Sequence, residues 1–209
     1  LIYDDNIEVE HLDEVFRALW LYFEDYDHKE TMRSEPVWKA YREIMSQYIV
    51  RDYNPDAALI DITIGLRWIY RFLIPLAITD VPKCDIAHLT LSGFPVIPAL
   101  IAHYKYGTKI MLTEHGVFIR ERLLALNNSE YPFFLKRLLT RFSEAIARLA
   151  YYKSEAIVSV NKFNIKWEKM YGADPSKISI IYNGIDSDKF KPKPKPDHLK
   201  NVPTVVAAA

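Results

Sequence analysis

The chain has 209 residues, of which 50% are hydrophobic and 26% are charged, and its formal net charge is zero. This composition is typical of a globular protein with a sizeable core, and the absence of any uninterrupted apolar stretch of about 18 residues argues against a membrane-spanning helix. The single cysteine, Cys84, argues against a disulfide framework and, with no secretory signal pattern at the start, indicates the cytoplasm.

The first part of the chain is expected to be helical. Residues 8–27 and 37–49 place apolar side chains at the spacing of one helix face. Residues 58–78 form a third, mostly apolar pattern that Gly65 and Pro75 interrupt. We expect these helices to serve packing.

From residue 82 onward, short apolar strands alternate with helices. The strands are expected at residues 85–89, 109–113, 156–160 and 178–182. The helices are expected at residues 95–106, from about 118, 131–152 and 161–171, with Gly107 as the stop of the first. This alternation predicts an α/β fold whose parallel sheet is covered by helices on both faces.

A linker is expected near the end. Residues 191–196 read Lys-Pro-Lys-Pro-Lys-Pro, which favours an extended, solvated connector. Because residues 202–208 look like a strand, we expect a piece of a longer protein. The predicted organisation is a domain at 1–184 that lacks its start, a linker at 185–201, and the first strand of a truncated domain at 202–209.

Charge is distributed unevenly along the chain. Residues 1–60 carry 14 acidic and 6 basic residues, whereas residues 117–209 carry 9 acidic and 16 basic residues. A basic second half can steer an anionic ligand, but a solvated helix face with a basic linker is the interpretation that we favour. Nucleic-acid binding is not expected, because the basic residues are not clustered with exposed aromatic ones.

Three polar segments follow predicted strands, where ligands bind to open parallel sheets. They are Ser92-Gly93, residues 113–116 and residues 183–186. In the second, Gly116 permits a close backbone approach, and His115 can donate a hydrogen bond or act as a base. The alternative is a strand-end histidine satisfied by local hydrogen bonds, with residues 120–122 as surface ion pairs.

Other chemistry-bearing patterns are missing. No spacing resembles a zinc site, and there is no dinucleotide-binding glycine motif, phosphate-binding loop or nucleophile elbow. His88 lies within an apolar strand and is expected to be a core residue. We expect His11 and His103 at helix surfaces and treat Cys84 as structural.

Three segments resemble a known family. Residues 181–186, Ile-Tyr-Asn-Gly-Ile-Asp, followed by Phe190, resemble the interdomain segment of retaining glycosyltransferases of family four. Residues 113–122, Thr-Glu-His-Gly-Val-Phe-Ile-Arg-Glu-Arg, closely resemble a run found in the PelF-type members of that family, and His88 with Ser92-Gly93 is similar to another. The chain departs from the latter pattern at Leu91.

The resemblance implies the N-terminal part of an enzyme with a GT-B fold, in which two Rossmann-like domains face a cleft. Such enzymes transfer a sugar from a nucleotide donor, here UDP-glucose or a similar one, to a growing polysaccharide with retention of configuration. It also implies exopolysaccharide biosynthesis, no essential metal or other cofactor, and a possible membrane-associated synthesis complex. The nucleotide-binding domain would be absent here, so this chain alone is expected to be inactive.

Residue roles also follow from the resemblance. His115 matches the histidine at the cleft and is the predicted catalytic residue. Predicted substrate contacts are Ser92, Gly93, Glu114, Gly116, Arg120 and Glu121, and the predicted interdomain hinge residues are Asn183, Gly184 and Asp186. The alternatives are a synthase closer to sucrose or glycogen synthases, and a non-catalytic GT-B-like subunit that binds carbohydrate or a partner.

Overall fold

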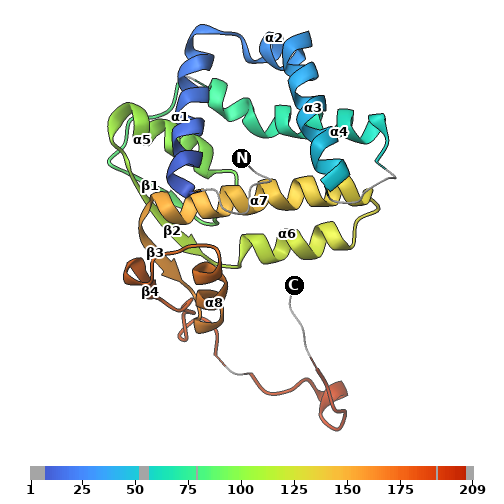
Figure 1. The fold of residues 1–209 in the computed structure, drawn as a ribbon. Coiled ribbons are helices and arrows are strands. Elements are labelled where there is room, and N and C mark those ends of the chain that lie inside the picture. Colours follow the sequence, from blue (N-terminus) through green and yellow to red (C-terminus); the bar gives the residue numbers. More distant parts are fainter. Residues whose placement is uncertain (1–7, 52–56, 79, 192, 206–209) are drawn as a thin grey trace.

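A parallel sheet lies at one end of the molecule (Figure 1). The structure is a computed structural model that describes residues 8–51, 57–78, 80–191 and 193–205, without the side chains of residues 49–51. In these ranges the sheet consists of β1 (Ile86–Leu89), β2 (Lys109–Glu114), β3 (Ser154–Ser159) and β4 (Ile178–Ile180), side by side in chain order. All three pairs of neighbours are parallel, which confirms the four predicted strands and a Rossmann-like α/β fold.

Helices connect the strands. α5 (Val96–Tyr106) joins β1 to β2, α6 (Phe118–Asn127) and α7 (Phe133–Lys153) join β2 to β3, and α8 (Lys162–Met170) joins β3 to β4. Each connection moves one strand further in the same direction, and right-handed crossovers of that kind place their helices on one face of the sheet.

The two faces of the sheet differ accordingly. Ile110, Leu112 and Ile157 point toward the helices and are almost fully buried. On the opposite face the side chain of Ile86 is 58% exposed, and His88, two residues along the same strand, is exposed too. The expectation of helices on both faces is therefore not met within the described residues, since all the crossovers run one way.

The helical N-terminal region packs over α7 (Figure 1). It contains α1 (Val9–Asp25), α2 (His28–Arg33), α3 (Glu35–Arg51) and α4 (Leu59–Leu73), followed by a 3-10 turn, η1 (Ile74–Ala77). α1 joins the main core with the sheet and α7, whereas α3 and α4 form a second core with one end of α7. The prediction of helices serving packing is confirmed.

Two boundaries differ from the sequence prediction. α2 was not predicted, because a six-residue helix is too short to show a period; its signal is Asp27, whose side chain accepts a hydrogen bond of 2.7 Å from the Glu30 amide. The apolar pattern at 58–78 divides into α4 and η1 because Pro75 has no amide hydrogen to continue an α-helix.

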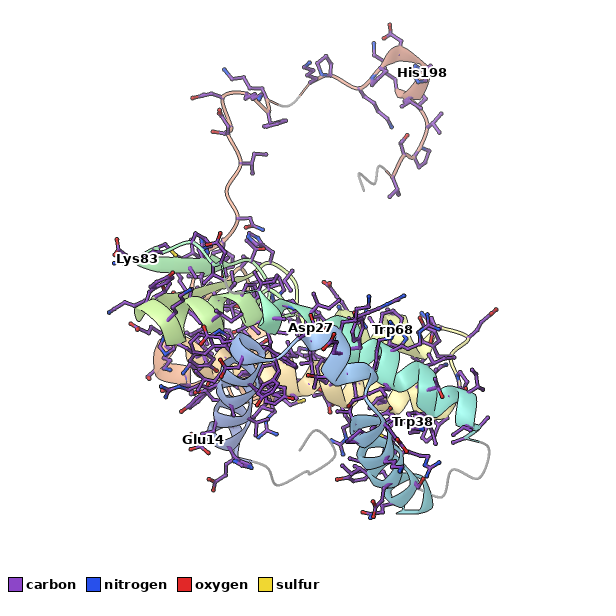
Figure 2. The ribbon with its side chains drawn as sticks, turned by 90° about the horizontal axis from the view of Figure 1, so that it is seen from above. Glu14, Asp27, Trp38, Trp68, Lys83 and His198 are labelled. Atoms are coloured by element: carbon purple, nitrogen blue, oxygen red, sulfur yellow. The ribbon has the colours of Figure 1, made fainter. Side chains whose placement is uncertain are left out.

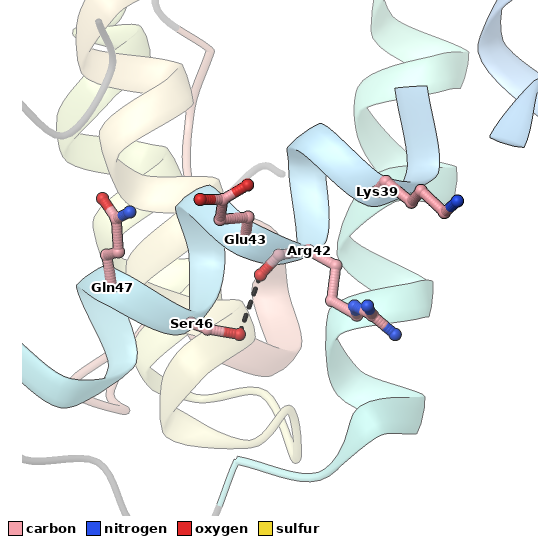
Figure 3. A pocket seen from close by; sticks show the side chains of 5 residues that line it. All are labelled: Lys39, Arg42, Glu43, Ser46 and Gln47. Carbon is pink, nitrogen blue, oxygen red and sulfur yellow. Dashed lines mark hydrogen bonds between the residues drawn. The ribbon is translucent and has the colours of Figure 1, made fainter. Parts of the chain in front are cut away.

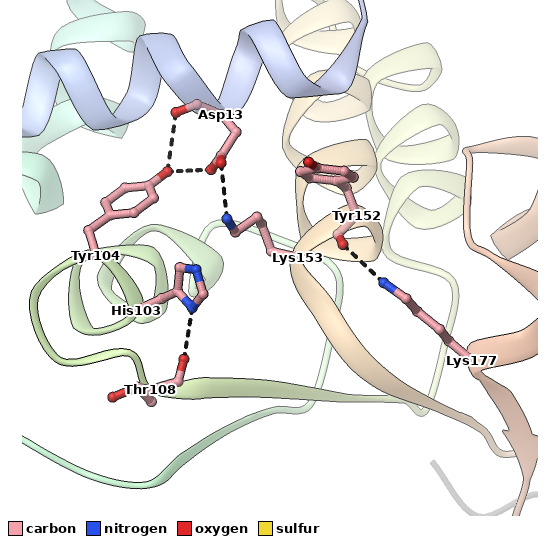
Figure 4. Close-up of polar contacts among 7 residues, drawn as sticks. All are labelled: Asp13, His103, Tyr104, Thr108, Tyr152, Lys153 and Lys177. Carbon is pink, nitrogen blue, oxygen red and sulfur yellow. Dashed lines mark hydrogen bonds and ion pairs between the residues drawn. The ribbon is translucent and has the colours of Figure 1, made fainter.

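A polar contact joins the helical region to the sheet domain (Figure 4). The Tyr104 hydroxyl of α5 donates to Asp13 Oδ1 of α1 at 2.5 Å, and Lys153 Nζ at the end of α7 lies 2.9 Å from Asp13 Oδ2. Burial and the neighbouring carboxylate raise the pKa of Tyr104 well above its usual value, so the phenol stays protonated and keeps donating. One carboxylate thus fixes three helices to each other.

The chain beyond β4 extends away from the domain (Figure 1). Its described residues are almost all exposed, and their regular structure is a short 3-10 turn at Asp197–Leu199. Residues 202–205 form a turn and irregular backbone, and residues 206–209 lie outside the described ranges. The linker and the truncated second domain therefore stay predictions.

None of the helices in the described ranges combines the length and the apolar character that crossing a bilayer requires.

Candidate functional site

The loops that follow β1 and β2 meet at one edge of the sheet. The strands are parallel neighbours, so their carboxyl ends lie together, and a hydrogen bond joins the two loops directly: the Ser92 amide donates to Glu114 Oε1 at 2.9 Å. Two of the three polar segments predicted from the sequence are thus adjacent, as their places after neighbouring strands imply.

Glu114 is the buried anchor of these loops. Its side chain is 0% exposed, and Oε2 accepts a hydrogen bond of 2.6 Å from the Tyr151 hydroxyl of α7. The Ser92 hydroxyl, equally buried, donates to the Tyr151 oxygen at 3.2 Å. Burial raises the pKa of Glu114, and the hydrogen bonds from Tyr151 and Ser92 oppose that rise. In this arrangement Glu114 and Ser92 face the interior and hold the loops in place.

Close packing favours glycine at position 93. A side-chain carbon at Gly93 would collide with Leu91 and lie 2.9 Å from the ring of Phe118, which is too close for non-bonded atoms. A side-chain carbon at Gly116 would meet the carboxylate of Glu121, a flexible side chain that can move away. Glu121 therefore folds back from the first turn of α6 over the backbone of Gly116.

His115 is exposed in the loop after β2, next to Gly116. Among the residues that the structure describes, its ring makes no hydrogen bond, and neither Arg120 nor Arg122 forms an ion pair with Glu121. The alternative, in which local hydrogen bonds satisfy His115 and residues 120–122 form surface ion pairs, is therefore not supported by the described residues. His115 and Arg120 remain accessible to a ligand at the edge of the sheet.

His88 is not the core residue that its apolar strand suggested. It is exposed on the uncovered face, where its Nε2 lies 2.7 Å from the Thr113 hydroxyl of the neighbouring strand. The prediction was wrong because it assumed that both faces of β1 are covered. The pair lies on the opposite face from Glu114, one residue before the strand ends.

Two further polar residues beneath this edge were missed in the sequence. Asn164 of α8 is buried, and its amide donates to the Glu114 carbonyl at 3.4 Å. Glu168, one helical turn later, is 0% exposed, and neither of its carboxylate oxygens has a hydrogen-bond partner among the described residues. Their spacing of four residues on a helix that follows the third strand is the signal that could have indicated them.

The environment of Glu168 disfavours its charged form. Burial raises its pKa, the nearby Ser159 hydroxyl opposes this in part, and the charge of Glu114 reinforces it. The Ser159 hydroxyl itself donates to the Asn161 carbonyl at 2.9 Å. Two buried carboxyl groups, Glu114 and Glu168, thus lie under the ends of β2 and β3.

The predicted hinge residues lie apart from these loops. Asn183, Gly184 and Asp186 are exposed after β4 and make no hydrogen bond to the loops of β1 or β2 within the described ranges. Asp186 Oδ1 accepts from the Asp188 and Lys189 amides at 3.0 and 3.1 Å, which closes a turn at the start of the linker.

Two other features carry no site chemistry. In the described ranges no three His, Cys, Asp or Glu side chains are grouped so that they could hold a metal ion. A hollow on α3 is formed by residues of a single helix face, whose side chains point in different directions (Figure 3). The Ser46 hydroxyl in this hollow donates to the Arg42 carbonyl of the same helix at 2.8 Å, so this hydroxyl already has a hydrogen-bond partner.

Comparison with known proteins places the chain in a family. Residues 3–176 match the family model described as a domain of unknown function (DUF3492), and no curated protein matches the chain. The match includes the helical region, three of the strands and the loops that carry Gly93 and His115. Because the match spans most of its length, the chain belongs to the DUF3492 family.

Proposed function

We propose that this chain is the acceptor-side domain of a retaining glycosyltransferase of family four, similar to the PelF-type enzymes. The enzyme would transfer a sugar from a nucleotide donor, UDP-glucose or a similar one, to a growing polysaccharide. The resemblance at residues 113–122 and 181–186 supports this, and DUF3492 domains typically occur in glycosyltransferases of family four.

The observation that carries the proposal is the placement of His115. It is exposed at the carboxyl edge of a parallel sheet, in a loop that a buried carboxylate, Glu114, joins to the neighbouring loop of Gly93. A donor group held rigidly at the point where charge develops stabilises a transition state without reorganisation. In this role the imidazole of His115 would donate a hydrogen bond to the transferring sugar.

The neighbouring residues fit separate tasks. Arg120 is exposed in the first turn of α6, where its guanidinium can pair with an anionic group of the donor. Glu121 and Gly116 together shape the loop that carries His115. We assign Glu114 and Ser92 a positioning role beneath that loop, because both are buried.

The second half of the site would come from a nucleotide-binding domain after the linker. Closure of that domain about Asn183, Gly184 and Asp186 would exclude water, which otherwise hydrolyses the donor. The reaction needs no metal in this proposal, and a cytoplasmic enzyme working with a membrane-associated polysaccharide synthesis complex is the setting we propose.

A donor screen tests this function. The full-length protein is incubated with several nucleotide sugars, with and without polysaccharide acceptor, and released nucleotide is measured. We expect release with UDP-glucose or a close relative that the acceptor increases, and none from residues 1–209 alone. Carbohydrate binding without release from any donor would instead support a non-catalytic GT-B-like subunit.

A further inference from the structure

An aromatic cavity of about 340 Å³ lies beside the loop that carries Gly93. It is enclosed by α4, the segment before α5, α6, the loop after α6, and α7. Its walls contain five aromatic side chains, namely Trp68 (labelled in Figure 2), Phe72, Phe94, Phe118 and Tyr131. This volume is within the range of small-molecule sites, which are mostly apolar with a few polar groups.

The aromatic rings form a continuous wall. The ring centres of Phe72 and Phe94 are 4.2 Å apart, and that of Trp68 lies 5.4 Å from Phe72. Tyr131 meets Trp68 edge-on at 6.4 Å and is 38% exposed, so it stands at the rim. Because the rings pack on each other, the wall is in place without a ligand.

Arg122 of α6 is the charged residue of this lining. Its Nε is buried and has no hydrogen-bond partner, and the guanidinium forms no ion pair with any residue that the structure describes. A buried donor without a partner destabilises a protein, and guanidinium groups pair best with carboxylate or phosphate. Arg122 as a residue is only partly buried, so it brings an unpaired positive charge to the cavity, and an anionic ligand fits that charge.

The charge of Arg122 also argues against a cationic ligand. Aromatic walls otherwise suit quaternary ammonium groups, but the Arg122 guanidinium in the lining repels a cation. The cavity therefore favours a ligand with negative charge.

The lining also restricts the body of the ligand. Apart from Arg122, the side chains of the lining with hydrogen-bonding groups are Ser129, Tyr131 and Trp68, and the Ser129 hydroxyl already donates to the Leu126 carbonyl at 2.7 Å. A hexose would bury several hydroxyl groups here without partners, which is unfavourable. An apolar body with one charged head leaves no such group unpaired.

We propose that this cavity binds an amphiphilic anion, a molecule with a hydrocarbon or aromatic body and one carboxylate or phosphate head. The body packs against the aromatic wall, and the head pairs with Arg122. Phe118 also contacts Gly93, so occupancy bears on the neighbouring loop, but the proposal stands on the cavity alone and does not depend on the glycosyltransferase assignment.

Ligand titration tests the proposal on the 209-residue chain. 4-Phenylbutyrate and geranyl phosphate serve as carboxylate and phosphate probes, and 4-phenylbutanol and geraniol as their neutral counterparts. Tryptophan fluorescence and calorimetry follow binding, and Trp68→Phe identifies the reporting tryptophan. We expect at least one anionic probe to bind saturably and about tenfold or more tighter than its neutral counterpart. The arm that binds more tightly identifies the head group.

Variants separate the charge from the apolar wall. Arg122→Met is expected to weaken the anionic probe at least tenfold without weakening the neutral one, and Arg122→Lys to retain part of the affinity. Ala125→Trp, at an exposed position on the rim, is expected to block both. The control Arg17→Met removes an exposed arginine of α1 and should change nothing.

The outcomes that overturn the proposal are clear. They are no saturable binding of either anionic probe, equal affinity for the anionic and neutral probes, or unchanged affinity in Arg122→Met. Circular dichroism establishes whether each variant is folded. If Arg122→Met is unfolded, Ala125→Trp decides whether the probes bind in this cavity.

Discussion

At the residue scale, the orientation of Glu114 decides what surrounds His115. Residues alternate across a strand, so Glu114 shares the buried face of β2 with Ile110 and Leu112. The alternation was readable in the sequence, and it would have separated Glu114, which positions the loop, from the exposed His115. Its partners were not readable, because Tyr151 lies 37 residues away and only the packed fold brings it to the carboxylate.

Tyr151→Phe tests the buried network. The substitution removes the 2.6 Å hydrogen bond and leaves Glu114 Oε2 buried without a donor, so we expect the free energy of unfolding to fall by about 1–3 kcal/mol. Urea denaturation measures it. The control is Tyr106→Phe at an exposed site on α5, expected to change stability by less than about 0.5 kcal/mol. Equal effects of the two would show that the network is not stabilising.

Glu168→Gln tests the second buried carboxyl group. Its raised pKa means that the folded state holds the proton at pH values where the unfolded chain has released it. The free energy of unfolding therefore falls as pH rises from the ordinary value of 4.5 through the raised pKa. The glutamine variant escapes this loss, so we expect its free energy of unfolding at pH 7 to exceed that of wild type by about 1 kcal/mol or more.

The comparison at two pH values makes that prediction specific. Below pH 4.5 the stability gain from Glu168→Gln should disappear, because the carboxyl group is then protonated in both states. Urea denaturation at pH 7 and pH 4 measures this, with Glu130→Gln, at an exposed carboxylate, as the control. A variant less stable than wild type at pH 7 would contradict the assignment of an unpaired buried charge.

At the element scale, periodicity in the sequence predicted the strands and the long helices. It did not predict the short helix α2 or the exposure of one face of β1. All four strands were found because their apolar runs are bounded by turn residues. α2 escaped because six residues contain fewer than two turns. The exposure of one face of β1 was not predicted, because sequence spacing does not show on which side of the sheet the connecting helices pass. For this reason His88 was wrongly predicted to be a core residue.

The end of α5 gives a prediction at this scale. Gly107 was expected to stop the helix, and it does so with a left-handed backbone at φ +71°. Gly107→Ala forces a side chain into that conformation, so we expect a loss of about 1 kcal/mol in the free energy of unfolding. The control is Gly184→Ala in the exposed segment after β4, whose stability effect is expected to be neutral. Chemical denaturation of both variants decides whether the left-handed turn matters to stability.

At the scale of the whole molecule, the chain combines a helical region and a sheet domain that share α7. Asp13 and the main core hold these parts together, and the loops that carry Gly93 and His115 lie at the edge of the sheet next to the aromatic cavity. The sequence resemblance predicted which loops would matter. It did not predict that Ser92 and Glu114 lie beneath the surface, because burial depends on the complete packing.

If His115 acts in sugar transfer, its loss slows the reaction without unfolding the protein. Acceptor-stimulated nucleotide release from UDP-glucose is measured for the full-length protein in wild-type form, as His115→Ala, and as His11→Ala, which alters an exposed histidine of α1. We expect a loss of about 10²-fold or more in kcat for His115→Ala with unchanged thermal stability, and wild-type rates for His11→Ala. A wild-type rate in folded His115→Ala would remove His115 from the site.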